Sequence, residues 1–277
     1  MERKVFILGS NGYLGSALME RLPAIPGIQV KGLDRDASPP QLEEILEWSQ
    51  ICILANGLSN HIAGQKDPFL DFQTNAVEPL QILKHGKSKS FLFLGSLCQY
   101  GPLEGEVLEN HPCEPVEPQG LSKLFMEGAL GFLQRSGHLN FLSLRLGAVF
   151  GAKSSFENPS LLEKMVLSKV QGEIFPVYGG KERIWSGLSI EHFVDAVSRI
   201  IEENRFDGEC FHFSTCAFPF SDLEPWLPLK FIESRNSPAY RINCQKFRDR
   251  YGWSFESISA GDIVRRLEFE IGQSKNI

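Results

Sequence analysis

The stretch Val5-Phe6-Ile7-Leu8-Gly9-Ser10-Asn11-Gly12-Tyr13-Leu14-Gly15 decides how this chain is interpreted. Its first four residues are apolar, as in a buried strand, and a glycine-rich turn follows them at once. Gly9 permits a tight turn, Gly12 lets the backbone approach a phosphate, and Gly15 allows a helix to pack close to the strand. A helix that begins here presents N–H groups and partial positive charge to an anion. The pattern predicts a dinucleotide-binding turn, with the spacing GxxGxxG rather than the more common GxGxxG.

An acidic residue follows the turn at the distance that a bound dinucleotide requires. Asp34 lies 19 residues after Gly15 (34 − 15), at the end of a predicted second strand over residues 28–33. A carboxylate there accepts hydrogen bonds from an adenosine ribose and repels a 2′-phosphate, which favours NAD over NADP. The neighbouring Arg35 weakens this preference, because a guanidinium can pair with a 2′-phosphate.

Short apolar runs alternate with helical patterns through the first half of the chain. After the first strand, runs typical of buried strands lie at 28–33, 51–54, 91–94 and 141–146, and helical patterns lie at 17–22, 121–133, 161–170 and 190–201. This alternation predicts an α/β fold with a doubly wound parallel sheet. The regularity weakens after Gly151. We therefore expect a dinucleotide-binding domain over 1–151 and a smaller substrate lobe over 152–277, with sheet elements returning from the second part to the first.

Composition and charge exclude several classes of protein. With 42% apolar residues among 277, the chain is too apolar to be disordered, and its net charge of −6 argues against nucleic-acid binding. No run of about 18 uncharged apolar residues is present to cross a membrane, and the first residues lack the apolar region of a signal peptide. Six cysteines at irregular spacings, without a CxxC pair, fit reduced thiols. We expect a cytoplasmic protein with no nucleic-acid partner, no membrane contact and no bound metal.

Further motifs carry a resemblance to a known family. They are Ile53-Leu54-Ala55-Asn56, Asn75 in Gln73-Thr74-Asn75-Ala76, Gly95-Ser96-Leu97-Cys98-Gln99-Tyr100-Gly101, Gln119-Gly120-Leu121-Ser122-Lys123, Leu144-Arg145-Leu146-Gly147-Ala148-Val149-Phe150-Gly151, Arg183, and Tyr251-Gly252-Trp253. In order and spacing they resemble the extended short-chain dehydrogenase/reductase family of nucleotide-sugar epimerases, dehydratases and reductases. The resemblance implies a Rossmann-like lobe, a smaller C-terminal substrate-binding lobe, often a homodimer, a nicotinamide cofactor (NAD, with NADP as the alternative) and a nucleotide-sugar substrate.

The glycine turn and the resemblance together assign site residues. The implied cofactor contacts are Gly9, Asn11, Gly12, Tyr13, Leu14, Gly15, Asp34, Arg35, Ala55, Asn75 and Lys123. The implied substrate contacts are Tyr100, Asn158 and Arg183, the last as a bidentate ligand of a pyrophosphate. The implied catalytic positions are Ser96, Gln119 and Lys123.

One of these catalytic positions departs from the family pattern. Relatives use a serine or threonine to hold the reacting oxygen, a tyrosine to pass its proton, and a lysine that binds the nicotinamide ribose and lowers the pKa of the tyrosine. Ser96 and Lys123 are present, but Gln119 stands at the tyrosine position, and its amide does not titrate near neutral pH. Gly147 and Ala148 also stand where many relatives place an asparagine that contacts substrate.

Three interpretations of the missing tyrosine remain open. Another group can supply the proton, the candidates being Tyr100, His111, Glu114, Glu117 or a relayed water. Alternatively, hydride chemistry proceeds without strong general-acid help, with a loss of about 10²–10⁴ in rate. In the third interpretation the chain is a non-catalytic dinucleotide-binding protein, a sensor or an accessory to a partner enzyme. We favour an enzyme acting on sugar nucleotides; an NADP-linked reductase of another carbonyl compound is a further alternative.

Overall fold

A computed structural model describes residues 2–34, 36–58, 61–86, 89–151, 159–233, 239–255 and 257–274. The chain divides into two compact units, which are described separately. The first unit consists of Met1–Gly101, Pro112–Arg145 and Val194–Phe211, and the second of Pro102–His111, Leu146–Phe193 and His212–Ile277. Residues 194–211 thus rejoin the first unit, while residues 102–111 leave it for the second.

A six-stranded sheet forms the centre of the first unit. Its strands are β1 (Arg3–Leu8), β2 (Ile28–Leu33), β3 (Ile51–Leu54), β4 (Ser90–Ser96), β6 (Asn140–Leu146) and β10 (Cys210–Phe213), in the order β10-β6-β4-β3-β1-β2. β1 pairs in parallel with both β2 and β3, and β3 pairs in parallel with β4. The predicted parallel α/β fold is confirmed, and each predicted strand coincides with an observed one.

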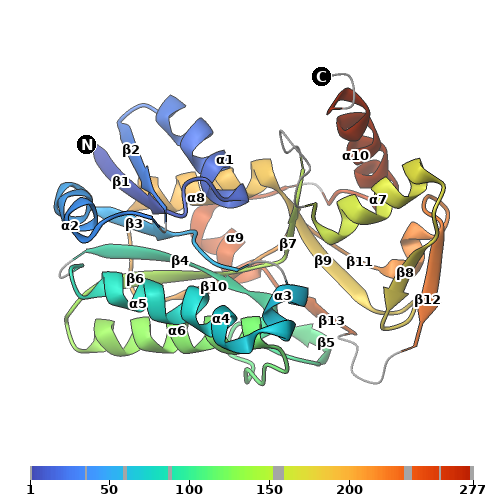
Figure 1. The fold of residues 1–277 in the computed structure, drawn as a ribbon, viewed down its shortest axis with the longest axis horizontal. Coiled ribbons are helices and arrows are strands. Elements are labelled where there is room, and N and C mark those ends of the chain that lie inside the picture. Colours follow the sequence, from blue (N-terminus) through green and yellow to red (C-terminus); the bar gives the residue numbers. More distant parts are fainter. Residues whose placement is uncertain are drawn as a thin grey trace. The chain divides into compact units, whose positions relative to one another are not determined.

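Helices cover both faces of this sheet. They are α1 (Tyr13–Arg21), α2 (Pro39–Trp48), α3 (His61–Lys66), α4 (Pro68–Phe72), α5 (Glu78–Leu83) and α6 (Pro118–Arg135), while α8 (Ile190–Glu203) belongs partly to each unit. In Figure 1, α5 and α6 lie on the side of the sheet opposite α1. Alternate strand residues explain the layers, because neighbours along a strand point to opposite faces. Phe6 and Leu8 on β1 share one core with Phe91 and Phe93 on β4 and with Met126 on α6.

The second unit has its own core. Its strands form a three-stranded sheet (β11-β9-β7) and two pairs (β12-β8 and β13-β5), with bounds β5 Glu104–Val107, β7 Ala148–Phe150, β8 Phe175–Tyr178, β9 Ile184–Ser189, β11 Cys216–Pro219, β12 Leu229–Ile232 and β13 Ala239–Ile242. Its further helices are α7 (Leu161–Gln171), α9 (Gln245–Tyr251) and α10 (Ala260–Ser274). Trp185 packs against the rings of Phe150 and Phe218, with centroids 5.7 and 5.2 Å away.

None of the six cysteines forms a disulfide. Within the described part of the chain, no helix is long and apolar enough to cross a membrane.

A buried ion pair ties α6 to β6 in the first unit. Arg145 Nη2 on β6 donates to Glu127 Oε1 on α6, and Arg145 Nε lies 3.2 Å from Glu127 Oε2. Ser143 Oγ donates to the same carboxylate at 2.6 Å, and Gln99 Nε2 at 3.3 Å. Burial raises the pKa of Glu127, but the hydrogen bonds and charge of Arg145, with those from Ser143 and Gln99, outweigh burial and hold the pKa below its usual range. The carboxylate is therefore charged and fully partnered.

We expect Glu127→Gln to lower the free energy of unfolding by about 3–5 kcal/mol at neutral pH, because Arg145 is left buried without a counter-charge. The pKa of Glu127 is lower in the folded state than in the unfolded state. Its contribution to the free energy of unfolding is therefore present above the ordinary pKa of a glutamate, 4.5, and is lost as the pH falls further. Urea unfolding of the native protein and of the Glu127→Gln variant at several pH values measures this effect. We expect the difference between their free energies of unfolding to shrink in acid. The matched control is Asp262→Asn, because Asp262 pairs with the exposed Arg265. We expect the urea midpoint of this variant to equal that of the native protein. Equal effects of the two substitutions at pH 7 would contradict the assignment.

Candidate active site

The glycine turn lies where the ends of three strands meet. The Gly9 N–H donates to Leu33 O of β2 at 2.8 Å, and Gly9 has a positive φ of 85°. A Cβ on Gly9 would lie 2.7 Å from the Cα of Asn56 and 2.9 Å from the carbonyl carbon of Ala55, at the end of β3. Gly12 is the N-cap of α1 and carries no side chain that could cap the helix. The first turn of α1 therefore faces this junction without a capping side chain from Gly12.

Gly15 sets the distance between α1 and the turn. A Cβ at this position would lie 2.0 Å from Gly9 O, far inside van der Waals contact. Only a glycine permits this approach, as the sequence pattern predicted.

The side chain of Asp34 is hydrogen-bonded to the same turn. Its Oδ2 accepts hydrogen bonds from Ser10 Oγ at 2.8 Å and from the Asn11 N–H at 3.1 Å. These bonds hold the carboxylate beside the turn, and the side chain stays partly exposed. A carboxylate has about four acceptor positions, so capacity remains for ribose hydroxyls. Arg35, the neighbour expected to weaken a preference for NAD, lies outside the described residues.

Asn75 and Lys123 meet beside the loop that follows β3. A Cβ on Gly57 would lie 2.6 Å from Asn75 Oδ1 and 3.5 Å from Lys123 Nζ. Asn75 Oδ1 accepts the Leu58 N–H at 2.8 Å, whereas Asn75 Nδ2 is buried and has no hydrogen-bond partner among the described residues. Buried donors of this kind are rare in folded proteins, so Asn75 Nδ2 is a group to which a ligand acceptor fits.

The charge of Lys123 depends on a residue that sequence reasoning missed. Burial lowers the pKa of Lys123 to about 8, and the nearby charge of Asp71 counters part of this shift. Asp71 is fully buried; its Oδ1 accepts from Ser122 Oγ at 2.7 Å, and its Oδ2 has no partner among the described residues. The available signal was an acidic residue inside the otherwise apolar run Phe69-Leu70-Asp71-Phe72.

Ser96 and Gln119 lie on two segments in direct contact. Ser96 ends β4, and its Oγ accepts the Cys98 N–H at 3.2 Å in the following short helix η3 (Leu97–Gln99). A Cβ on Gly120 would lie 2.3 Å from Cys98 O, so the first turn of α6 packs against this helix. Gln119 Oε1 is buried and has no partner among the described residues. This oxygen can accept a hydrogen bond from a hydroxyl, but the amide supplies no titratable proton.

The other candidates for proton transfer have different surroundings in the structure. Tyr100 is fully buried, Arg145 Nη1 donates to its hydroxyl, and burial raises its pKa far above the usual range. His111 belongs to the second unit, and its Nδ1 accepts the Leu108 N–H at 3.0 Å. The N–H of Glu114 donates to Tyr100 O at 3.2 Å. Glu117 lies 2.9 Å from His61 Nδ1, on the same turn of chain as Gln119.

The predicted substrate contacts other than Tyr100 fall outside the first unit or outside the described residues. Arg183 is in the second unit, where its Nη1 donates to Tyr178 O at 2.9 Å and its guanidinium lies 5.6 Å from the centre of the Phe220 ring. Asn158 lies outside the described residues. Of the two residues at the position of the family's asparagine, Gly147 has no room for a side chain, because a Cβ there would lie 2.8 Å from Ser186 O of β9.

The parallel sheet and the glycine turn at the end of its first strand define an α/β protein of the Rossmann-like class. The model of the NAD dependent epimerase/dehydratase family matches residues 5–212, and the chain belongs to this family. Its cofactor is accordingly NAD.

Individual relatives are distant. The UDP-glucose 4-epimerase of Streptococcus mutans is 24% identical over 182 residues, 54% of this chain and 53% of the relative, so this match spans about half of that protein. A UDP-glucose 4-epimerase of Lactobacillus helveticus is 22% identical over 264 residues, covering 80% of this chain and 79% of the relative. Among solved structures, the UDP-glucuronic acid 4-epimerase of Bacillus cereus, in complex with UDP-glucuronic acid and NAD, superposes with a TM-score of 0.84 at 17% identity, over 98% of this chain and 99% of that one. This likeness confirms the fold.

We expect Gly15→Ala to lower the free energy of unfolding by about 1–3 kcal/mol and to weaken NAD binding, because the methyl group must push α1 away from Gly9 O. The matched control is Gly131→Ala, also within a helix, where the nearest atom is a flexible Arg135 nitrogen at 3.3 Å. That change should be neutral or stabilising by up to about 1 kcal/mol. Urea unfolding and NADH titration measure both effects. A Gly15→Ala protein that matches the Gly131→Ala protein in stability and NADH affinity would refute the close contact.

Proposed function

We propose that this chain is an NAD-dependent enzyme that epimerises, dehydrates or reduces a nucleotide-linked sugar. The observation that carries the proposal is a set of buried polar groups in the first unit that have no partner among the described residues, namely Asn75 Nδ2 beside Lys123 and Gln119 Oε1 beside the Ser96 turn. A purely structural core would leave few such groups unpaired. Their donors and acceptors suit the hydroxyls of a ribose and of a sugar.

We infer that NAD would lie along the glycine turn, the end of β3, and the side chains of Asn75 and Lys123. The turn from Gly9 to Gly15, with Asn11, Tyr13 and Leu14, would hold the pyrophosphate at the start of α1, and Asp34 would accept hydrogen bonds from the adenosine ribose. Ala55 would line the cofactor where β3 ends against Gly9. Asn75 and Lys123 would bind near the nicotinamide ribose.

Three residues of this chain have proposed roles in the reaction. Bound NAD supplies the site that accepts and returns a hydride. Ser96 would donate a hydrogen bond to the reacting oxygen and hold it in position, and Gln119 Oε1 would accept one from a substrate hydroxyl. Lys123, with a pKa of about 8, carries a positive charge at neutral pH that favours a developing negative charge nearby.

A nucleotide sugar is the substrate class that the family and the resemblance support. Two curated relatives bear the name UDP-glucose 4-epimerase. Arg183, with a planar guanidinium, would bind the pyrophosphate of the substrate, and Asn158 would contact the sugar. Tyr100 is left out of the proposed contacts because its side chain is fully buried. The six free thiols support a cytoplasmic location.

We also propose that the chain forms a homodimer through α6. Leu121, Phe125 and Phe132 are 53%, 44% and 63% exposed, and with Gly128 they follow the spacing of one helical stripe. Phe69 on the neighbouring α4 is 89% exposed. Such apolar surface is costly in water and is typical of a contact with another protein. A two-fold axis beside α6 would bring the same stripe of a second copy against it, with Gly128 allowing close approach.

We expect NMR of the purified protein, incubated with NAD and a panel of nucleotide sugars, to show new sugar signals. NMR is chosen because epimerisation leaves the mass unchanged. Lys123→Met should abolish the signals by removing the buried cation, while Lys169→Met, on a surface pair with Glu268, should leave them intact. A turnover rate unchanged or lowered by Gln119→Tyr would show that the native proton donor is another group. Cofactor binding with no conversion across the panel would favour a non-catalytic binding protein.

We expect sedimentation to give the mass of two chains for the native protein and that of one chain for Phe125→Glu, because a charge at the centre of the stripe cannot be buried unpaired. Phe269→Glu is the control, since Phe269 is 67% exposed on α10 but lies outside the stripe. A native protein with the mass of one chain at all concentrations, or a dimer unaffected by Phe125→Glu, would disprove this interface.

A further inference from the structure

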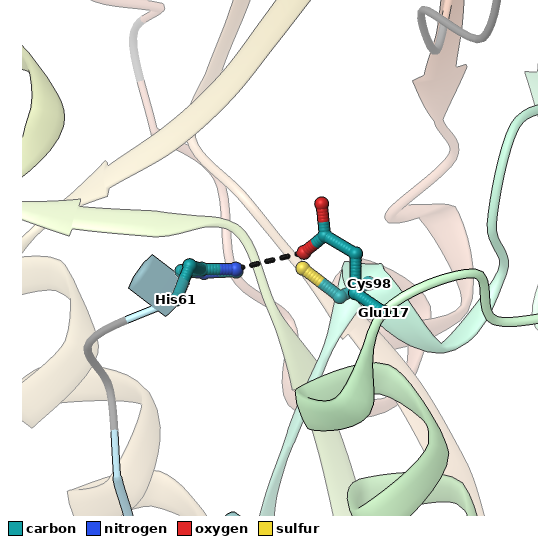
Figure 2. Close-up of side chains that lie close together, drawn as sticks. All are labelled: His61, Cys98 and Glu117. Atoms are coloured by element: carbon teal, nitrogen blue, oxygen red, sulfur yellow. Dashed lines mark hydrogen bonds and ion pairs between the residues drawn. The ribbon is translucent and has the colours of Figure 1, made fainter. Parts of the chain in front are cut away.

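Three side chains of the kinds that bind metal ions converge at the start of α6. His61 is the first residue of α3, Cys98 lies in the short helix after β4, and Glu117 is the N-cap of α6. One ligand atom from each lies within 4.8 Å of the other two. Figure 2 shows the imidazole, the thiol and the carboxylate turned toward one another, with His61 Nδ1 2.9 Å from Glu117 Oε2. All three residues belong to the first unit.

Each of the three donor types is a known zinc ligand. Zinc takes imidazole nitrogen, thiolate sulfur and carboxylate oxygen, and its catalytic sites have three protein ligands with a fourth position open. In a tetrahedral site with these donors, the ligand atoms are about 3.3–3.6 Å apart. A separation of 4.8 Å must therefore shorten by little more than about 1 Å, and the 2.9 Å between His61 Nδ1 and Glu117 Oε2 must lengthen by about 0.4 Å.

The surroundings hold the turn at Cys98 in place and leave the side chains of His61 and Glu117 room to move. The Cys98 N–H is bonded to Ser96 Oγ at 3.2 Å, and the close contact of Cys98 O with Gly120 fixes this turn against α6. The side chains of His61 and Glu117 are 45% and 37% exposed, so both can rotate. Their exposure also leaves an ion accessible to water or to a ligand at the fourth position.

We propose that His61, Cys98 and Glu117 form a binding site for one zinc ion. The convergence of three different ligands, from segments separated by 37 residues (98 − 61) and 19 residues (117 − 98), supports a metal site over a simple hydrogen-bonded pair. No such set was expected from the sequence, because its spacing matches no zinc motif.

The position of this site bears on the missing tyrosine, and this step rests on the proposed function. Cys98 follows Ser96 by two residues and Glu117 precedes Gln119 by two residues. An ion here lies close to the groups proposed to hold the reacting oxygen. Zinc with an open position lowers the pKa of a bound water to about 7. The site thus offers a proton donor and acceptor near neutral pH, which the amide of Gln119 does not.

Cobalt titration of the full chain, purified free of metal, tests the site without any need for turnover. We expect one Co²⁺ per chain, with the ultraviolet charge-transfer band of a cobalt–thiolate bond and the intense visible bands of a tetrahedral ion, both removed by one equivalent of Zn²⁺. Cys98→Ser should remove the charge-transfer band. His61→Gln and Glu117→Gln should each weaken binding on the order of tenfold or more.

Two control substitutions separate this site from general metal binding. Cys113→Ser changes another partly buried cysteine that forms no disulfide, and His85→Gln breaks a surface histidine–glutamate pair (His85 with Glu43, 3.4 Å). Both should leave the cobalt spectrum and affinity unchanged, and circular dichroism confirms that each variant is folded. Absence of a thiolate band, or its loss with Cys113→Ser but not with Cys98→Ser, would overturn the proposal. Cobalt binding as expected without sugar conversion would reject the proposed function and leave the metal site standing.

Discussion

The contact between helix α1 and the carbonyl oxygen of Gly9 is the constraint on which the cofactor end of the site depends. A methyl group on Gly15 would lie 2.0 Å from that oxygen, so the helix can begin there only because the side chain is absent. The same turn packs on the end of β3, through Gly9 against Asn56. It is held to the end of β2 by Asp34, which bonds to Ser10 and the Asn11 N–H. Three parallel strand ends and one helix start are thereby fixed around one short loop.

The sequence predicted those features that depend on neighbouring residues. Four-residue apolar runs indicated the buried strands, because a strand covered on both faces has no polar side to interrupt it. The glycine spacing predicted the turn, and the structure supplies the clash that explains Gly15.

Features that arise from residues distant in the sequence were missed or placed differently. The burial of Tyr100 depends on Arg145, and the charge environment of Lys123 depends on Asp71. The cluster of His61, Cys98 and Glu117 exists only because three segments fold together. The assignment of residues 102–111 to the second unit likewise follows from the tertiary pairing of β5 with β13. None of these relations leaves a periodic signal in the sequence.

The catalytic end of the site is distinguished by what replaces a tyrosine. Gln119 brings an acceptor without a titratable proton, while Lys123 remains as a buried cation with a pKa of about 8. In the proposed function, a group outside the usual set supplies the proton, or the reaction proceeds without strong general-acid help. Among the described residues, one cluster of three potential metal ligands was found, and it flanks Gln119 and Ser96.

Calorimetric titration of the purified chain with NAD and with NADP tests the central claim most directly, namely that the glycine turn and Asp34 form an NAD site. The account predicts one NAD per chain, bound more tightly than NADP, because the 2′-phosphate of NADP would meet the carboxylate held beside the turn. Binding of neither dinucleotide, or tighter binding of NADP than of NAD, would contradict it.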